Sequence, residues 1–177
     1  MRNLLLACLF LFCAAGLLAC SDPARTARRE IDRVTRITQR TEVNLKRDTR
    51  AALLSVAKTE GTRRGVELKA QGCLAAMASQ PSTSLEEPCK GIAAASEKRY
   101  ADATAKIMVP AKKVDQAIGA VYASLLVVLD VLEDVNAGLK PGGWQAKLAG
   151  LVAEAVKLYG DAVTAYTAWK ATVGGTP

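Results

Sequence analysis

Residues 114–135 read VDQAIGAVYASLLVVLDVLEDV, and the apolar pattern of this stretch decides the fold. Apolar residues that return at alternating steps of four and three form one stripe along a helix and predict left-handed supercoiled packing against other helices. Residues 116–129 carry no charge, but these fourteen residues are fewer than the roughly 20 that cross a bilayer. We therefore expect a helix of a bundle core. The residues of the repeat are Val114, Ile118, Val121, Leu125, Val128, Leu132 and Val135.

A second stretch with the same repeat follows after a turn. Residues 138–143 read GLKPGG, and these glycines and the proline predict the end of one helix and a reversal of the chain. Two helices, over about 90–137 and 142–172, are therefore expected to form an antiparallel hairpin. The second repeat consists of Trp144, Leu148, Leu151, Ala155, Leu158, Ala162, Ala165 and Trp169.

The segment before this hairpin is expected to form another long helix, over about 24–79, with a sparser apolar stripe. Counted from the cysteines, it extends 49 residues from Cys73 back to Ala24, and the next helix extends 48 residues from Cys89 to Ala137. At 1.5 Å per residue each is roughly 70 Å long, so we expect the two to pair in antiparallel. Pro110 is expected to kink the second of them. The sparser stripe consists of Ile31, Val34, Ile37, Leu45, Leu53 and Val56.

These helices predict an all-α fold, an elongated antiparallel three-helix bundle or coiled coil. The helix over 142–172 is shorter than the other two, so they are expected to continue beyond it as a two-helix arm. The arm, residues 58–100, is rich in Ala and poor in large apolar residues. We expect the chain to form a rod roughly 70 Å long.

The N-terminal segment has the order of a secretory signal peptide. Arg2 precedes an uncharged stretch, residues 3–21, with an apolar middle. Its end, Leu17-Leu18-Ala19-Cys20, resembles the lipobox of bacterial lipoproteins. The resemblance implies a cleaved signal peptide over 1–19 and a single helical domain over 20–177. An uncleaved signal anchor is the alternative, but it does not explain a Cys at the end of the apolar run.

The same resemblance implies a modification and a location. Cys20 is expected to carry a diacylglycerol thioether and an acylated amine, with acyl chains such as palmitate, and several chains together anchor a protein stably. Ser21 follows Cys20, whereas Asp at that place favours retention in the inner membrane. The expected location is therefore the outer membrane, lipid-anchored and facing the periplasm, with the inner membrane as the alternative.

The cysteines leave one pairing. Of the five, Cys8 and Cys13 lie in the expected signal peptide and Cys20 is taken by lipid, so Cys73 and Cys89 remain. In an oxidising periplasm these two are expected to form a disulfide worth about 3 kcal/mol in the chain-entropy model. A redox-active pair is the alternative, but neither flank resembles a CxxC motif at a helix start, which would lower a thiol pKa.

The composition argues against most enzyme classes. The chain has no His, 5% aromatic residues and a net charge of +7 from 24 basic and 17 acidic residues. It also lacks Gly-rich nucleotide-binding motifs, GxSxG and HExxH. The densest carboxylate cluster, Asp130, Glu133 and Asp134, is typical of a solvated helix end. We therefore assign no catalytic residue, metal ligand or cofactor and expect that the protein is not an enzyme.

The excess positive charge lies on the first helix. Residues 22–70 hold thirteen Lys and Arg against seven Asp and Glu, a net of +6, whereas residues 71–177 hold ten of each. Basic residues beside a lipid anchor favour anionic headgroups. The alternative is a solvated face with pairs such as Arg29 with Asp32, and the absence of aromatic residues there argues against nucleic acid. The basic, membrane-proximal face consists of Arg25, Arg28, Arg29, Arg33, Arg36 and Arg40.

Four aromatic residues lie on the expected helix over 142–172. Trp144 and Trp169 fall on its core repeat and are expected to pack. Tyr159 and Tyr166 lie seven residues apart and off the repeat, so they mark either the edge of the core or an edge open to a partner.

Two classes of function remain open. The first is a structural or interaction protein of the envelope, an adaptor similar to secretin pilotins or phage-related envelope proteins, whose envelope protein partner would contact the end of the arm that carries Cys73 and Cys89. The second is an inhibitor or enzyme of the cell envelope. We prefer the first because it requires only shape and surface.

Replacing Cys20 by Ala is expected to release the protein from the membrane fraction or to stall its processing, because the lipidated residue is lost. Membrane fractionation and the mass of the mature protein measure this outcome. Unchanged fractionation together with an unchanged mass would contradict the role assigned to Cys20.

Overall fold

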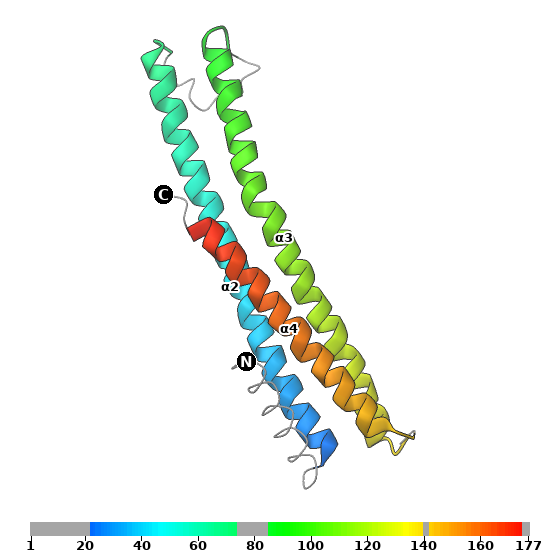
Figure 1. Ribbon diagram of the computed structural model, residues 1–177. Coiled ribbons are helices and arrows are strands. Elements are labelled where there is room, and N and C mark those ends of the chain that lie inside the picture. Colours follow the sequence, from blue (N-terminus) through cyan, green and yellow to red (C-terminus); the bar gives the residue numbers. More distant parts are fainter. Residues whose placement is uncertain (1–21, 74–84, 140–141, 175–177) are drawn as a thin grey trace, which may run out of the picture. The chain divides into compact units, whose positions relative to one another are not determined.

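The computed structural model describes residues 22–73, 85–139 and 142–174, and in these ranges the chain forms three helices (Figure 1). They are α2 (Pro23–Ala70), α3 (Cys89–Asn136) and α4 (Trp144–Gly174). The predicted all-α fold with three packed helices is confirmed. The expected signal peptide and Cys20 lie outside the described residues.

The start of α2 is defined by Asp22 and Pro23. The Asp22 carboxylate accepts a hydrogen bond from the Ala24 N–H over 3.1 Å, and its carbonyl accepts one from Thr26 over 3.1 Å. Pro23 occupies the first helical position, where a missing N–H costs nothing. The local sequence therefore begins this helix without help from other helices.

Gly72 ends α2 earlier than the sequence predicts. Its φ of 76° is in the left-handed region, and it donates to the Lys69 carbonyl over 3.1 Å while Cys73 donates to the Leu68 carbonyl over 2.8 Å. This pair of bonds is a Schellman motif, which closes a helix. The prediction that the helix continues to about residue 79 was therefore wrong, because Gly72 adopts a conformation that turns the chain.

The same motif ends α3, as predicted at Gly138. Gly138 has φ of 84° and donates to the Val135 carbonyl over 3.2 Å, and Leu139 donates to the Asp134 carbonyl over 3.0 Å. Both closures satisfy carbonyl groups that a helix end otherwise leaves open.

The described residues belong to two compact units, each of which contains a part of every helix. Unit 1 combines residues 22–40 with 117–162, and unit 2 combines residues 41–116 with 163–174. In unit 1, Arg28 of α2 and Asn136 of α3 line the same hollow, and in unit 2 Cys73 is bonded to Cys89. Residue numbers increase along α2 in the direction in which they decrease along α3. The two helices therefore run antiparallel in each unit (Figure 1).

The core of unit 1 follows the predicted repeat on α3, whereas on α4 the predicted core residues Trp144, Leu151 and Leu158 are only half-buried. On α4 the buried positions are spaced by seven, with Leu148, Ala155 and Ala162 each 2% exposed. On α2, Thr38 is 1% exposed, whereas Ile37, which the sequence analysis placed on the stripe, is only half-buried. Thr38 keeps the alternating spacing of Ile31 and Val34, so register rather than polarity selects the core residue. The buried residues of α3 in this unit are Ile118, Val121, Leu125, Val128, Leu132 and Val135.

The core of unit 2 has two parts. Where α4 is present, Leu45, Ile107, Val114 and Trp169 are buried. Beyond the red end of α4, the ends of α2 and α3 continue as a pair, which is the predicted two-helix arm (Figure 1). Leu68, Ala93 and Ser96 are among the buried residues of this arm.

Replacing Leu125 by Ala is expected to lower the free energy of unfolding by about 2–5 kcal/mol, because its side chain is only 4% exposed and leaves a cavity when removed. The neighbouring Leu126 is 62% exposed and is the matched control, for which we expect a change within about 0.5 kcal/mol. Chemical denaturation followed by circular dichroism measures both. Equal losses for the two variants would contradict the register of α3.

Candidate functional site

The predicted arginines form one exposed stripe on α2. Two residues correspond to about 200° of turn in a helix, and Arg29 lies two residues from both Ala27 and Ile31, which are buried. Arg36 lies two residues from the buried Val34 in the same way. The stripe therefore faces away from the core, except at Arg28, which lies beside the core and lines a hollow with Asn136 of α3. All six members are exposed, and we call them the arginine stripe: Arg25, Arg28, Arg29, Arg33, Arg36 and Arg40.

Few acidic groups neutralise the arginine stripe. Arg33 lies 4.0 Å from Glu30, and both side chains are largely exposed. Arg36 donates from Nε to the backbone carbonyl of Asp32 over 3.1 Å. The pair between Arg29 and Asp32, an example given for the alternative of a solvated face, is not among the ion pairs of the described residues. Exposed pairs of this kind contribute little to stability.

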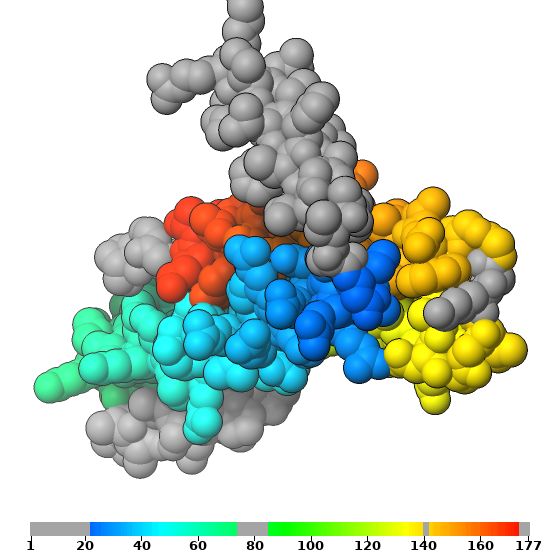
Figure 2. Space-filling view, turned by 90° about the horizontal axis from the view of Figure 1, so that it is seen from below, coloured from blue at the N-terminus to red at the C-terminus, as the bar shows by residue number. Residues whose placement is uncertain are grey.

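The carboxylate cluster at the end of α3 has no special geometry. Glu133 lines a hollow of about 420 Å³ in unit 1 together with Arg28 and Asp32 of α2, and Figure 2 shows the blue start of α2 on the face that also carries the yellow end of α3. No group of three His, Cys, Asp or Glu residues in the described ranges could hold a metal ion.

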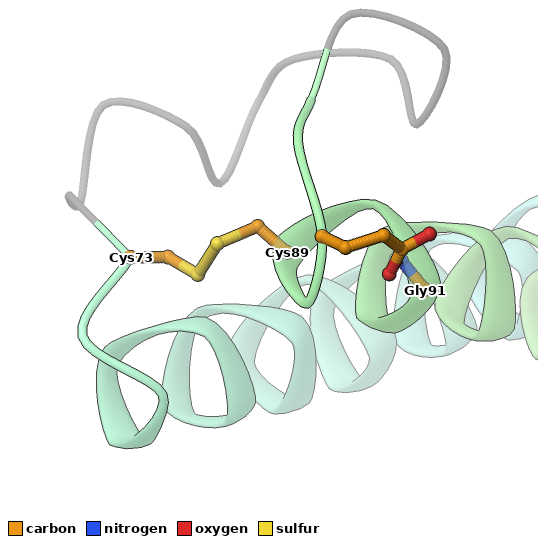
Figure 3. Close-up of a disulfide and its surroundings, with 4 residues drawn as sticks. Cys73, Cys89 and Gly91 are labelled. Carbon is orange, nitrogen blue, oxygen red and sulfur yellow. A yellow bond between two sulfur atoms is a disulfide. The ribbon is translucent and has the colours of Figure 1, made fainter.

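The predicted disulfide between Cys73 and Cys89 is present (Figure 3). Cys73 follows the Schellman motif of α2 and Cys89 is the first residue of α3, so the bond joins the end of one helix directly to the start of the next. Their Cα atoms are 6.3 Å apart. The Glu87 carboxylate accepts a hydrogen bond from the Gly91 N–H over 3.3 Å and caps α3 beside the bond. The closed end of the arm is thus held covalently and by a helix cap.

A charged network, which the sequence analysis missed, also holds the arm together. Arg99 of α3 donates to Glu60 over 3.1 Å and to Glu67 over 2.8 Å, both on α2. The hydrogen bond from Arg99, followed by that from Arg63, lowers the pKa of the Glu67 carboxyl. Glu60 and Glu67 are seven residues apart, a spacing that was a detectable signal of one shared face. Their common partner depends on helix pairing and is not visible in the sequence.

Tyr166 is half-buried, and its side chain forms contacts within unit 2. Its hydroxyl donates to Asp48 over 2.7 Å, and Lys170 approaches the same carboxylate oxygen at 3.3 Å. The hydrogen bond from Tyr166 is the main cause that lowers the pKa of the Asp48 carboxyl. The Tyr166 ring centroid is 6.0 Å from that of Trp169. Of the two sequence-based interpretations of Tyr166, packing at the edge of the core is the one that applies.

Trp169 ties α4 to α3 near Pro110. Its Nε1–H donates to the carbonyl of Ile107 over 3.2 Å, and Trp169 is 3% exposed. Pro110 lies inside α3 and has no N–H, so it cannot donate to the carbonyl four residues earlier. The carbonyl that lacks this donor is that of Lys106, and the indole donates to the neighbouring carbonyl of Ile107. The predicted kink at Pro110 stays a prediction.

Unit 2 also contains an open groove between α2 and α3. Its volume is about 570 Å³, and apolar residues dominate its lining. The sequence analysis did not anticipate this feature, although the adjacent pair Leu53 and Leu54 was a signal, because two neighbouring apolar residues cannot both face a narrow core. The groove residues are Leu45, Lys46, Thr49, Arg50, Leu53, Leu54, Ala57, Tyr100, Met108, Ala111, Lys112 and Asp115.

Comparison of the chain with protein-family models, with curated proteins and with solved structures gives no match. Among the described residues, no helix contains an apolar stretch long enough to cross a membrane. The assignment of function therefore depends on the arginine stripe, the disulfide and the groove themselves.

Replacing Tyr166 by Phe is expected to lower the free energy of unfolding by about 1 kcal/mol at neutral pH, because the bond to Asp48 is lost. Since the folded protein lowers the pKa of Asp48, the stabilisation is present above the unfolded pKa of about 3.9 and is lost as the pH falls through the folded value. The difference between variant and wild type should therefore shrink in acid.

The measurement is urea denaturation over a range of pH. Tyr159, which is half-buried on the same helix, provides the control variant Tyr159→Phe, for which we expect a smaller and pH-independent change. A Tyr166→Phe difference that stays constant down to pH 2 would contradict the charge-assisted bond.

Proposed function

We propose that this chain is a lipid-anchored helical protein of the bacterial cell envelope, attached through Cys20 to the outer membrane and facing the periplasm. It acts as a structural or interaction protein, an adaptor that binds another envelope protein. Its charged surface orients it on the membrane, and it needs no cofactor for this role.

The arginine stripe is the observation that carries this proposal. It begins at Arg25, five residues after the cysteine that resembles a lipidation site. All six arginines are exposed, and all but Arg28 lie opposite the core. Each basic residue near an anionic membrane surface contributes about 1 kcal/mol, and such contributions add to the effect of a lipid anchor. A stripe in this position brings the flank of α2 toward anionic headgroups.

The disulfide supports the compartment. Disulfides persist in oxidising environments such as the periplasm and are rare in reducing ones. The bond between Cys73 and Cys89 therefore agrees with export by the segment that resembles a lipoprotein signal. The disulfide and the expected lipid anchor at Cys20 both agree with a protein that faces the periplasm.

The outer surface of α3 in unit 1 supports a protein partner. Leu126 is 62% exposed and Val127 is 46% exposed. Leu129, which is 45% exposed, instead lines the hollow beside α2. Adjacent exposed apolar side chains such as Leu126 and Val127 are typical of protein interaction sites. This surface adds a second candidate contact to the arm tip, which was the site expected from the sequence.

The membrane contribution of the arginine stripe is best measured without the lipid. The full chain carrying Cys20→Ala is expected to bind vesicles that contain phosphatidylglycerol and to release them as salt rises, because exposed charges are screened. Adding Arg25→Glu and Arg29→Glu should lower the affinity about tenfold or more, a loss of about 1.4 kcal/mol.

The matched control adds Lys147→Glu and Lys157→Glu, which change the net charge equally on exposed positions of α4. Vesicle flotation gives the bound fraction, and circular dichroism checks the helix content. An equal loss of affinity for both pairs would show that net charge alone matters and would refute the orienting role of the stripe.

A further inference from the structure

The groove of unit 2 has the shape and lining of a binding site for a chain molecule. Its residues on α3 from Lys112 to Tyr100 extend about 18 Å along the helix at 1.5 Å per residue. This length is comparable to that of an extended acyl chain. The volume of about 570 Å³ is within the range of about 300–1,000 Å³ that is usual for small-molecule sites.

Large apolar side chains in the groove are not covered by the described residues. Leu54 is 61% exposed, Met108 is 44% exposed and Tyr100 is 41% exposed. Covering such surface is favourable by about 25 cal/mol per Å², so an apolar occupant is stabilised here. All groove residues belong to α2 and α3, and α4 leaves this surface open.

The polar residues of the groove carry mainly positive charge. Three cations, Lys46, Arg50 and Lys112, stand against one carboxylate, Asp115. Lys46 is paired with Glu42. Arg50 and Lys112 are exposed and form no ion pair with any described residue, so they are available to an anion.

We propose that this groove binds a single acyl chain with an anionic headgroup. The headgroup is held by Arg50 and Lys112, and the chain extends from there along Leu53, Leu54 and Ala57 of α2 toward Tyr100 of α3. This inference is independent of the lipid anchor and of the arginine stripe, which belongs to unit 1.

A partner helix fits the groove less well than an acyl chain does. A helix about 10 Å across and 18 Å long occupies roughly 1,400 Å³, more than twice the volume of the groove. Only its side chains could enter. A methylene chain can lie between α2 and α3 and contact both helices along its length.

Photolabelling tests the proposal on the purified full chain. The probe is palmitate with a photoreactive diazirine on the chain, used below its micelle concentration, and labelled peptides are located by mass spectrometry. We expect the label on the α2 and α3 segments of the groove. The variant Leu54→Glu should lower this label at least fivefold, because it places a carboxylate in the groove.

The control variant is Val66→Glu. Val66 is 63% exposed on the same helix, which matches the 61% exposure of Leu54, and it lies outside the groove. Both variants should keep wild-type helix content. Label that lies elsewhere on the chain, or that falls equally in both variants, would overturn the proposal.

The headgroup preference is tested by competition between amphiphiles of equal chain length. Laurate should displace the probe at a concentration at least fivefold lower than lauryl trimethylammonium, and this preference should disappear in the double variant Arg50→Glu with Lys112→Glu. Equal competition by the two amphiphiles in the wild type would refute an anionic site. Groove residues that cross-link to a protein in membranes but never to the probe would overturn the acyl chain in favour of a partner helix.

Discussion

The apolar repeat of α3 is the constraint on which the rest of the structure depends. From Ile107 to Val135 its core positions return at steps of four and three, and every one of them is at most 7% exposed. A helix with one apolar stripe gains most of its stability from the helices that cover the stripe. The other two helices must therefore present matching positions, which explains the buried Val34 on α2 and the buried Ala155 on α4.

The arm shows what replaces the repeat where large apolar residues run out. Ala93 and Ser96 are buried there, and side chains of this size bury little apolar area. Arg99 bridges Glu60 and Glu67, and the disulfide closes the end. Half-exposed ion pairs stabilise a structure only modestly, so the covalent bond matters more in the arm than in the apolar core.

The two surfaces proposed to bind ligands, the arginine stripe and the groove, consist mainly of residues outside the buried core positions. The arginine stripe, apart from Arg28, is opposite the core on α2 in unit 1, and the groove of unit 2 lies beside the core, where apolar and basic side chains share one surface. Both surfaces suit anionic, amphiphilic ligands, and both are built from helix faces. A protein without His can bind in this way because recognition here needs only apolar area and fixed positive charge.

The sequence by itself determined the helices, the core positions of α3 and the single cysteine pairing, because these depend on local propensity, on a repeat along one helix and on the number of thiols left. The sequence also contains Gly72, a residue type that often ends a helix, but the helix-favouring residues after it hid this end of α2. Other features depend on how α2 and α3 align. Thr38 is buried because its position faces the core, although its side chain is polar. Arg99 meets Glu67 across 32 residues of sequence, and the groove combines residues of two helices. Only the tertiary structure decided these contacts, because a register between helices sums many weak packing preferences that no single segment contains.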